Sequence, residues 1–421
     1  MKNLRELLKE RYLTPIKENP HLYLGVELEF PIVQVFGQAT DPAVGKSLIA
    51  HLEGKFGFES VKVDSEGQVI ELSSPDTEDV IMFELTYNTL ELAFGKADRI
   101  GQIDQRFQLY LAEIQSFLGQ YDHALAGLGI NPAWAINDNR AVKVDRYQML
   151  LSYLALYKGM PQAERFHTYP DYGSFICGNQ VQFDVSKANY LRVLNAFNKI
   201  EAAKAYLFAN SPFEGEDWGT SISRDLFWEN SMHGLFKKNI GIYEQDFQTE
   251  EDFLDYLEES CLFYVYRNGE ILYFPPIQLK DYIDQVEIEA FDLSGKTRVI
   301  QPETSDLDQH RAYYYELLTT RGTVECRSVC TQALDKTFTP IAFQLGLLVK
   351  LDALERLLAS SDFFELWGRD YAKLRRQFAS NHLSKKELES IRDFSQELCH
   401  LAKEGLQERG FGEEVYLENL V

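Results

Sequence analysis

Basic residues are scarce in this chain relative to acidic ones. Lysine and arginine together number 42, against 65 aspartates and glutamates, so the formal net charge is −23. No segment clusters the lysines and arginines that would neutralise the phosphates of a nucleic acid, and we therefore expect no nucleic-acid partner. A surface with this excess of negative charge mainly favours solubility.

Cysteine and long apolar runs are also scarce. The five cysteines are an odd number in 421 residues, without a C-x-x-C spacing, which argues against a disulfide framework and a structural zinc site. No run approaches the roughly 20 apolar residues of a membrane span. The first 20 residues have an amphipathic, charged pattern that is unlike a signal peptide. We expect a soluble cytoplasmic protein with no membrane partner.

Apolar and aromatic residues are plentiful. Hydrophobic residues make up 45% of the chain, with 28 phenylalanines and 23 tyrosines, which is typical of a folded globular protein. The length of 421 residues is compatible with one large domain or with two or three smaller ones.

Hydrophobic periodicity predicts strands alternating irregularly with helices. Helical spacing covers about 4–12, 46–56, 77–120 with breaks near Gly95 and Gly101, 146–157, most of 185–260, and the chain after 338. Strand patterns cover 22–33, 61–75, 123–134, 176–185, 261–274 and 323–330, and two of these contain hairpin turns, at 65–67 and at Asn268-Gly269. This order favours an α+β fold on a mostly antiparallel sheet.

The strand LYLGVELEFPIV, residues 22–33, carries two glutamates on one face. Side chains alternate along a strand, so Glu27 and Glu29 point the same way while Val26 and Leu28 point the other. Residues two apart lie roughly 6.5–7 Å apart at Cα, so the two charges repel unless a cation lies beside them. Taken alone, the pattern also fits an edge strand with an acidic face in water.

Three further strand patterns repeat this arrangement of apolar residues on one face and polar residues on the other. Hard cations such as Mg²⁺ take carboxylate oxygens together with substrate phosphates. A sheet face lined by such acids can hold two or three Mg²⁺ ions and, through them, a nucleotide; a solvated sheet face is the alternative. The polar residues on these strands are Asp64, Glu71, Gln180, Gln182, Asp184, Glu325 and Arg327.

Several motifs resemble those of the glutamate–cysteine ligases, the γ-glutamylcysteine synthetases, and are most similar to the plant-type branch. The most specific is YLFANSPFEGEDWGTSISRDLFW, residues 206–228. The others are GVELEF, EGQVIELSSP, GLGINPAW, RYQMLLSY, GNQVQFDV, FYVYRNGEILY and TVECRSV. In order they cover roughly residues 22–345, and the segment GLQERGFGEEVYLENL near the end is also similar to relatives.

The resemblance implies a glutamine-synthetase-like fold, with a mostly antiparallel sheet forming a funnel and helices packed outside. It implies one catalytic domain over 1–421, with a core at about 22–345 and a helical part at about 338–421. It also implies ATP as co-substrate, glutamate as substrate, two or three Mg²⁺ ions, and a place in glutathione biosynthesis.

The resemblance also implies roles for single residues. Arg224 resembles the arginine that holds glutamate, Arg146 and Arg327 resemble phosphate or substrate contacts, and Gln180 stands at a metal or nucleotide position. Glu325 and Arg327 are the expected catalytic pair. The expected metal ligands are Glu27, Glu29, Asp64, Glu71 and Glu325.

The implied reaction joins glutamate to an amine through γ-glutamyl phosphate, with cysteine as the expected amine. The segment VDSEGQVIE is one residue longer and poorer in glycine than the plant-type pattern, which affects the equivalence of Asp64 more than that of Glu71. No residue is tied to a thiol substrate, so another amine stays open as the acceptor. A non-catalytic sensor of nucleotide or amino acid is the alternative from a different class. The sequence does not give the oligomeric state.

Overall fold

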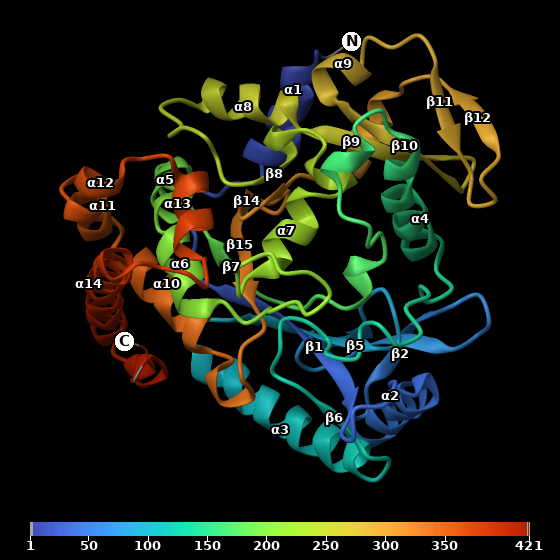
Figure 1. Ribbon diagram of the computed structural model, residues 1–421, viewed down its shortest axis with the longest axis horizontal. Helices are drawn as coiled ribbons and strands as arrows, with labels where there is room; N and C mark the ends of the chain where they lie inside the picture. Colours follow the sequence, from blue (N-terminus) through green and yellow to red (C-terminus); the bar gives the residue numbers. More distant parts are fainter. Residues whose placement is uncertain (1–2, 419, 421) are drawn as a thin grey trace.

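An open antiparallel sheet organises the molecule. The computed structural model describes residues 3–418 and 420, and among these the largest sheet has nine strands. Its order is β14 (Glu316–Leu318), β15 (Thr323–Cys330), β7 (Gly178–Asp184), β1 (Leu24–Gln34), β5 (Thr89–Ala97), β4 (Val80–Phe83), β3 (Val69–Ser73) and β2 (Glu59–Val63), and β6 (His123–Leu125) pairs with the end of β1. Figure 1 shows β1, β7 and β15 crossing the centre of the molecule.

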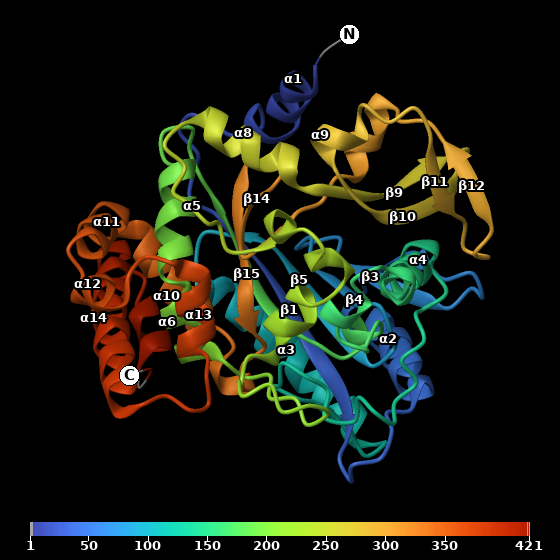
Figure 2. The ribbon, with the colours of Figure 1, turned by 45° about the horizontal axis from the view of Figure 1, so that its top comes forward.

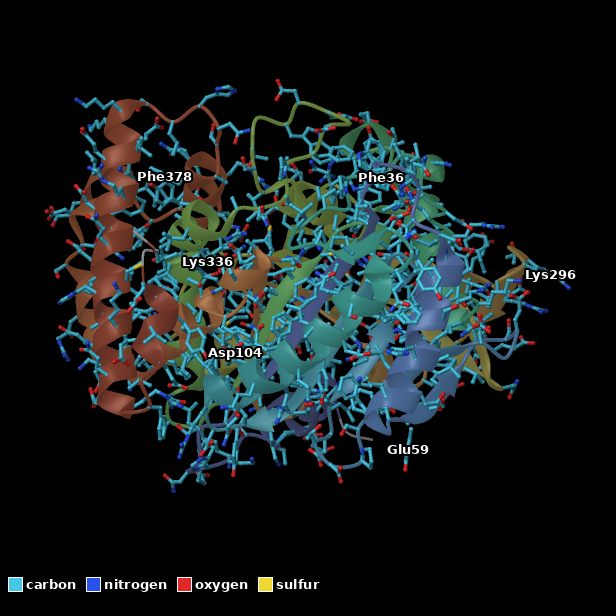
Figure 3. The ribbon with its side chains drawn as sticks, turned by 90° about the horizontal axis from the view of Figure 1, so that it is seen from below. Phe36, Glu59, Asp104, Lys296, Lys336 and Phe378 are labelled. Carbon is cyan, nitrogen blue, oxygen red and sulfur yellow. The ribbon has the colours of Figure 1, made fainter. Side chains whose placement is uncertain are left out.

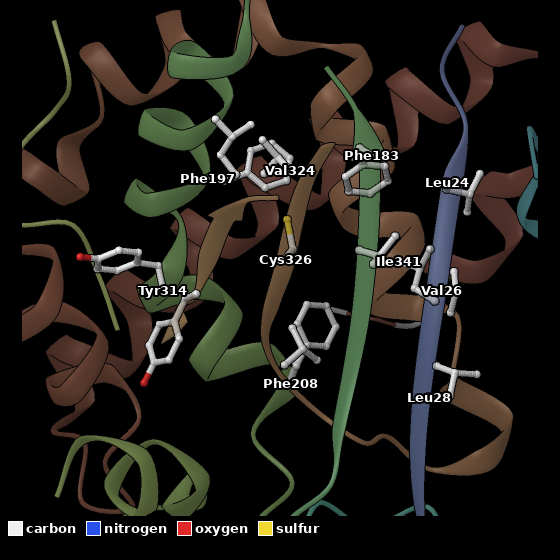
Figure 4. Packing of buried hydrophobic residues seen from close by; sticks show 14 of the residues in the cluster. Leu24, Val26, Leu28, Phe183, Phe197, Phe208, Tyr314, Val324, Cys326 and Ile341 are labelled. Carbon is white, nitrogen blue, oxygen red and sulfur yellow. The ribbon is translucent and has the colours of Figure 1, made fainter. Parts of the chain in front are cut away.

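One face of this sheet is apolar and covered by helices. Leu24, Val26 and Leu28 of β1 are at most 1% exposed, and Figure 4 shows them beside Phe183 of β7 and Ile341. Figure 3 shows α2 (Pro42–Phe56) and α3 (Ile100–Gly119) lying across the sheet when the molecule is seen from below. Further helices on this flank are α5 (Tyr190–Lys199), α6 (Glu201–Phe208), α10 (Thr339–Val349), α11 (Leu351–Ala359), α12 (Asp362–Trp367), α13 (Tyr371–Phe378) and α14 (Lys385–Arg409). Figure 4 shows Phe197 of α5 and Phe208 of α6 in the same apolar cluster.

A second layer lies over the polar face. It contains a four-stranded antiparallel sheet of β9 (Cys261–Arg267), β10 (Glu270–Gln278), β11 (Ile288–Phe291) and β12 (Thr297–Ile300), next to α4 (Asp145–Leu154) in Figure 2. A short parallel pair joins β8 (Ile240–Gly241) to β13 (Tyr313–Tyr314). The other helices are α1 (Leu4–Leu8, continued by a π-helical turn Lys9–Leu13), α7 (Ser223–Glu229), α8 (Glu250–Glu259) and α9 (Leu279–Tyr282).

The predicted α+β class and the mostly antiparallel sheet are confirmed, and several local predictions are confirmed with them. The strand predicted at 323–330 is β15. Asn268 and Gly269 have φ of 52° and 83°, as the two-residue turn between β9 and β10 requires. The chain after 338 is helical as predicted, and its longest helix, α14, begins with a capping box formed by Ser384 and Glu387.

The prediction of one long helical stretch over 77–120 is wrong in its first half. Residues 80–83 and 89–97 are the strands β4 and β5, and the helix α3 begins only at Ile100. The spacing of Phe83, Leu90 and Phe94 is close to a helical period, but Leu90, Leu92 and Phe94 also alternate as in a strand, and pairing with β1 decides between the two. The strand predicted over 123–134 is confined to β6.

Among the described residues, no single helix is long and apolar enough to span a membrane. One pair of helical segments, Leu334–Val349 with Leu351–Trp367, passes the same test of length and composition together, with a bend of 88° between them.

Candidate active site

A cavity of about 300 Å³ opens on the polar face of the large sheet. Its floor comes from β1, β5, β7 and β15, and its walls come from α4, the π-helical turn near Tyr12 and the segment 310–321. The structure brings six of the predicted site residues together in its lining: Glu27, Glu29, Arg146, Gln180, Glu325 and Arg327.

Two amides of β7 hold the carboxylates of the neighbouring strands. Gln182 Nε2 donates to Glu27 Oε1 and to Glu325 Oε2, both at 2.9 Å. Gln180 Nε2 donates to Glu29 Oε1 at 3.2 Å, and the backbone N–H of Gly178 donates to Glu29 Oε2 at 2.5 Å. The alternation of β7 places both glutamines on the polar face, so the carboxylates of β1 and β15 are fixed from the strand between them.

The charged forms of Glu27 and Glu29 on β1 are electrostatically unfavourable. Burial, followed by the charge of Glu325, raises the pKa of Glu27 to about 7. Burial also raises the pKa of Glu29 to about 7, against the lowering effect of Arg224. Both shifts mean that the charged forms are destabilised where they stand, and a bound cation would relieve this repulsion.

Sequence reasoning missed two further cavity acids, Glu84 and Glu91. Glu91 lies directly opposite Glu29 in the pairing of β5 with β1, and Glu84 follows the end of β4. Burial raises the pKa of both, and the charge of Glu84 adds to the effect at Glu91. The signal for Glu91 was present, because TLELAF repeats the alternation of VELEF, but it fell inside the segment predicted as helical.

Four arginines balance these acids. Arg327 lies 3.4 Å from Glu325, with its guanidinium 5.9 Å from the Trp228 ring and 5.8 Å from the Tyr313 ring. Arg146 enters from α4. Arg311 and Arg321, which the sequence did not single out, come from the segment that forms the wall. Four guanidinium groups facing five carboxylates suit a ligand that carries several negative charges and brings cations with it.

Arg224 lies behind the cavity rather than in its lining. It is 4% exposed on α7, and its Nη1 donates to the backbone oxygen of Arg327 at 2.9 Å. Its guanidinium packs on Gly178, where a Cβ would lie 2.6 Å from Nη2. The Nε group of Arg224 has no hydrogen-bond partner among the described residues. The structure therefore brings Arg224 next to the site of Glu29, with a donor still available.

Asp64 and Glu71 do not reach the cavity. Asp64 Oδ1 accepts the backbone N–H groups of Glu66 and Gln68 at 2.9 and 3.0 Å, so its carboxylate closes the β2–β3 turn. Glu71 shares the polar face, since it lies opposite Met82, which lies opposite Glu91. It is nevertheless three strand spacings from β1, roughly 14 Å. Neither acid is brought together with the cavity carboxylates.

The cavity acids fit Mg²⁺ as pairs rather than as a closed cage. No group of three or more acidic, histidine or cysteine side chains within the described part of the chain is placed to hold a metal ion. Mg²⁺ commonly uses one or two carboxylates and completes its shell with water and substrate phosphates. Glu27 with Glu325, bridged by one amide nitrogen, supplies such a pair.

Comparison with known proteins assigns the family. The model of glutamate-cysteine ligase family 2 matches residues 23–418. A chloroplastic glutamate–cysteine ligase of Solanum lycopersicum is 23% identical over 342 residues, covering 78% of this chain and 60% of that protein. Glutamate–cysteine ligase A of Oryza sativa subsp. indica is 22% identical over 337 residues, covering 78% and 64%. The match thus spans less than two thirds of the length of these relatives.

Solved structures give a weaker comparison. Glutamate–cysteine ligase of Francisella tularensis, solved with AMP, overlaps with a TM-score of 0.34 at 12% identity, covering 96% of this chain and 98% of that one. The bifunctional glutathione synthetase of Pasteurella multocida overlaps with a TM-score of 0.35 at 10% identity, covering 98% and 51%. Both TM-scores are low, so the family assignment rests on the sequence. With residues 23–418 matched by the family model, this chain belongs to glutamate-cysteine ligase family 2.

Proposed function

We propose that the chain is an ATP- and Mg²⁺-dependent ligase that forms a γ-glutamyl amide, with glutamate as acid and cysteine as the expected amine. The observation that carries this proposal is the cavity in which Glu27, Glu29, Glu84, Glu91 and Glu325 face four arginines. Family membership supports the same reaction class.

The reaction has two steps. The γ-carboxylate of glutamate attacks the terminal phosphorus of ATP, giving γ-glutamyl phosphate and ADP. The amine then attacks the acyl carbon, phosphate leaves with the bonding electrons, and the amine loses a proton. No protein nucleophile is needed, and the described cavity lining contains neither serine nor cysteine.

Charge neutralisation and alignment are the main tasks of the residues. Mg²⁺, held by pairs such as Glu27 with Glu325, would supply charge to the phosphates. Arg327 and Arg146 would bind phosphate oxygens or the substrate carboxylate, and Gln180 keeps Glu29 oriented. The main contribution of such a cavity to the first step would be to hold the γ-carboxylate of glutamate and the terminal phosphate of ATP in line.

The test is phosphate release with ATP, Mg²⁺ and glutamate across a panel of amines. Release with cysteine alone would identify the acceptor, and release with a different amine would reassign it. Tight ATP binding without release with any amine would favour the nucleotide sensor instead.

Glu27→Gln tests the metal assignment, since it removes a charge at nearly constant volume. We expect turnover to be lost while the fold is retained, as judged by circular dichroism. Glu59→Gln, on the exposed strand β2, is the matched control and should keep its activity. Full activity of Glu27→Gln would contradict the role of Glu27 as a metal ligand.

A further inference from the structure

A second hollow of about 230 Å³ lies on the same sheet face, beyond the catalytic cavity. Its floor is Gly25 of β1, and its wall includes Gln182 and Asp184 of β7 and the side chain of Arg321. Alternation places Gly25 on the face that carries Glu27. Because glycine has no side chain, the space above it stays open. A Cβ at Gly25 would have only Gln182 Cβ within 4 Å, at 3.9 Å.

The charge of this hollow is opposite to that of the chain. Lys17, Lys96 and Arg321 line it together with one acid, Asp184, in a protein whose net charge is −23. Lys17 pairs with Asp184 at 3.3 Å. Lys96 lies 5.5 Å from the centre of the Tyr23 ring, and Arg321 Nη2 donates to the neutral amide oxygen of Gln182 at 2.6 Å.

Two of these cations therefore form no ion pair with a described residue. Within the described part of the chain, neither Lys96 nor Arg321 has a carboxylate at ion-pair distance. The charge of Arg321 also acts on Glu27 of the neighbouring cavity, whose pKa it lowers. The lining still carries three cations and one acid. A concave site with such an excess of positive charge concentrates anions from solution, and an arginine fork suits a carboxylate in particular.

Arg321 lines both this hollow and the catalytic cavity. Gln182 separates the two, because its amide nitrogen holds Glu27 and Glu325 while its oxygen accepts from Arg321. The second hollow is thus a separate space, but it is one side chain away from the acids of the first.

We propose that this hollow is a binding site for a small carboxylate of amino-acid size. Arg321 and Lys96 hold the carboxylate, and Asp184 accepts from the ammonium group when the ligand is an amino acid. The volume is below the roughly 300–1,000 Å³ of sites for larger organic ligands. The site does not depend on the ligase reaction, so it can be tested without turnover.

The test is calorimetric titration of the full chain with succinate, in EDTA and without ATP. We expect binding that weakens about tenfold in Lys96→Glu, because a favourable charge becomes a repulsive one. Lys296→Glu makes the same change at the exposed turn between β11 and β12 and should leave binding unchanged. Titration with L-aspartate tests the ammonium contact, which should make binding tighter than with succinate and lose that advantage in Asp184→Asn.

Three results would overturn the proposal. One is the absence of succinate binding to the wild type. Another is equal binding by the wild type and Lys96→Glu. The third is binding that is lost in Arg146→Gln but kept in Lys96→Glu, which would place the ligand in the catalytic cavity.

Discussion

Glu27 is a partly buried acid without a cation at ion-pair distance among the described residues, and this destabilises its charged form. Its hydrogen bond comes from the neutral amide of Gln182. Its pKa rises to about 7 from an ordinary value of 4.5, so the folded protein holds the proton more tightly than the unfolded chain does. The ionised form therefore destabilises the metal-free protein above pH 7, and the penalty disappears as pH falls to 4.5.

Glu27→Gln should for this reason stabilise the metal-free protein at alkaline pH. The rise in the pKa of Glu27 from 4.5 to about 7 corresponds to about 3 kcal/mol of unfolding free energy at pH 8. The gain in the variant should shrink toward zero at pH 4.5. Urea unfolding in EDTA at the two pH values measures it, with Glu59→Gln as control. An equal gain at both pH values would show that ionisation of Glu27 does not destabilise the folded protein.

The strands show how far the sequence predicts the site and where it fails. Alternation in VELEF, NQVQFDV and TVECRSV correctly placed Glu27, Glu29, Gln180 and Glu325 on one face, because burial of the other face fixes the register. Glu91 was not predicted as a site residue because its strand, β5, lies in the segment that was predicted as helical. Asp64 was misplaced because alternation does not continue through the β2–β3 turn, where its carboxylate binds backbone N–H groups. The segment 310–321 has no periodic pattern, so Arg311 and Arg321 could not be placed without tertiary structure.

Helix α13 supports the arginines of the site from behind the sheet. Arg375, 2% exposed, donates to Asp225 Oδ2 from Nε at 2.7 Å and to the backbone oxygen of Ser328 at 3.1 Å. It also binds Glu201, which pairs with Lys204. Asp225 and Ser328 each neighbour an arginine of the site in sequence, so this buried cluster joins α6, α7, α13 and β15.

Arg375→Ala should destabilise the protein by about 3–5 kcal/mol, because it leaves buried carboxylates without their cation. Denaturant unfolding of the full chain measures the loss. Arg392→Ala removes a half-exposed arginine 3.8 Å from Asp393 and should change stability by about 0.5 kcal/mol or less. Similar values for both variants would argue that the cluster contributes little.

At the scale of the whole molecule, a buried and neutral histidine joins three segments that are far apart in the sequence. His310 accepts from Tyr12 at Nδ1 and donates from Nε2 to Ser260 Oγ, which in turn donates to the oxygen of Leu257. Burial, followed by Arg11, lowers the pKa of His310 to about 3. In the unfolded chain His310 binds a proton below about pH 6.5, whereas in the folded protein it stays neutral until about pH 3. The stability that neutral His310 contributes is therefore fully present above pH 6.5 and is lost as pH falls toward 3.

His310→Gln should remove this acid sensitivity. Relative to the variant, the wild type should lose about 1.4 kcal/mol per pH unit between pH 6.5 and 3. Unfolding free energies of both proteins at pH 7, 6 and 5 give the difference, in which other titrating groups cancel. His400→Gln, on an exposed position of α14, should instead run parallel to the wild type. A constant difference between His310→Gln and the wild type would refute the prediction.

All five cysteines are free and buried, at Cys177, Cys261, Cys326, Cys330 and Cys399. Burial raises the pKa of each thiol, so the reactive thiolate is scarce as well as enclosed. The folded protein can therefore be handled in thiol and disulfide buffers without forming mixed disulfides. A thiol-reactive dye should label it only when it opens, so the rate of labelling would report unfolding directly.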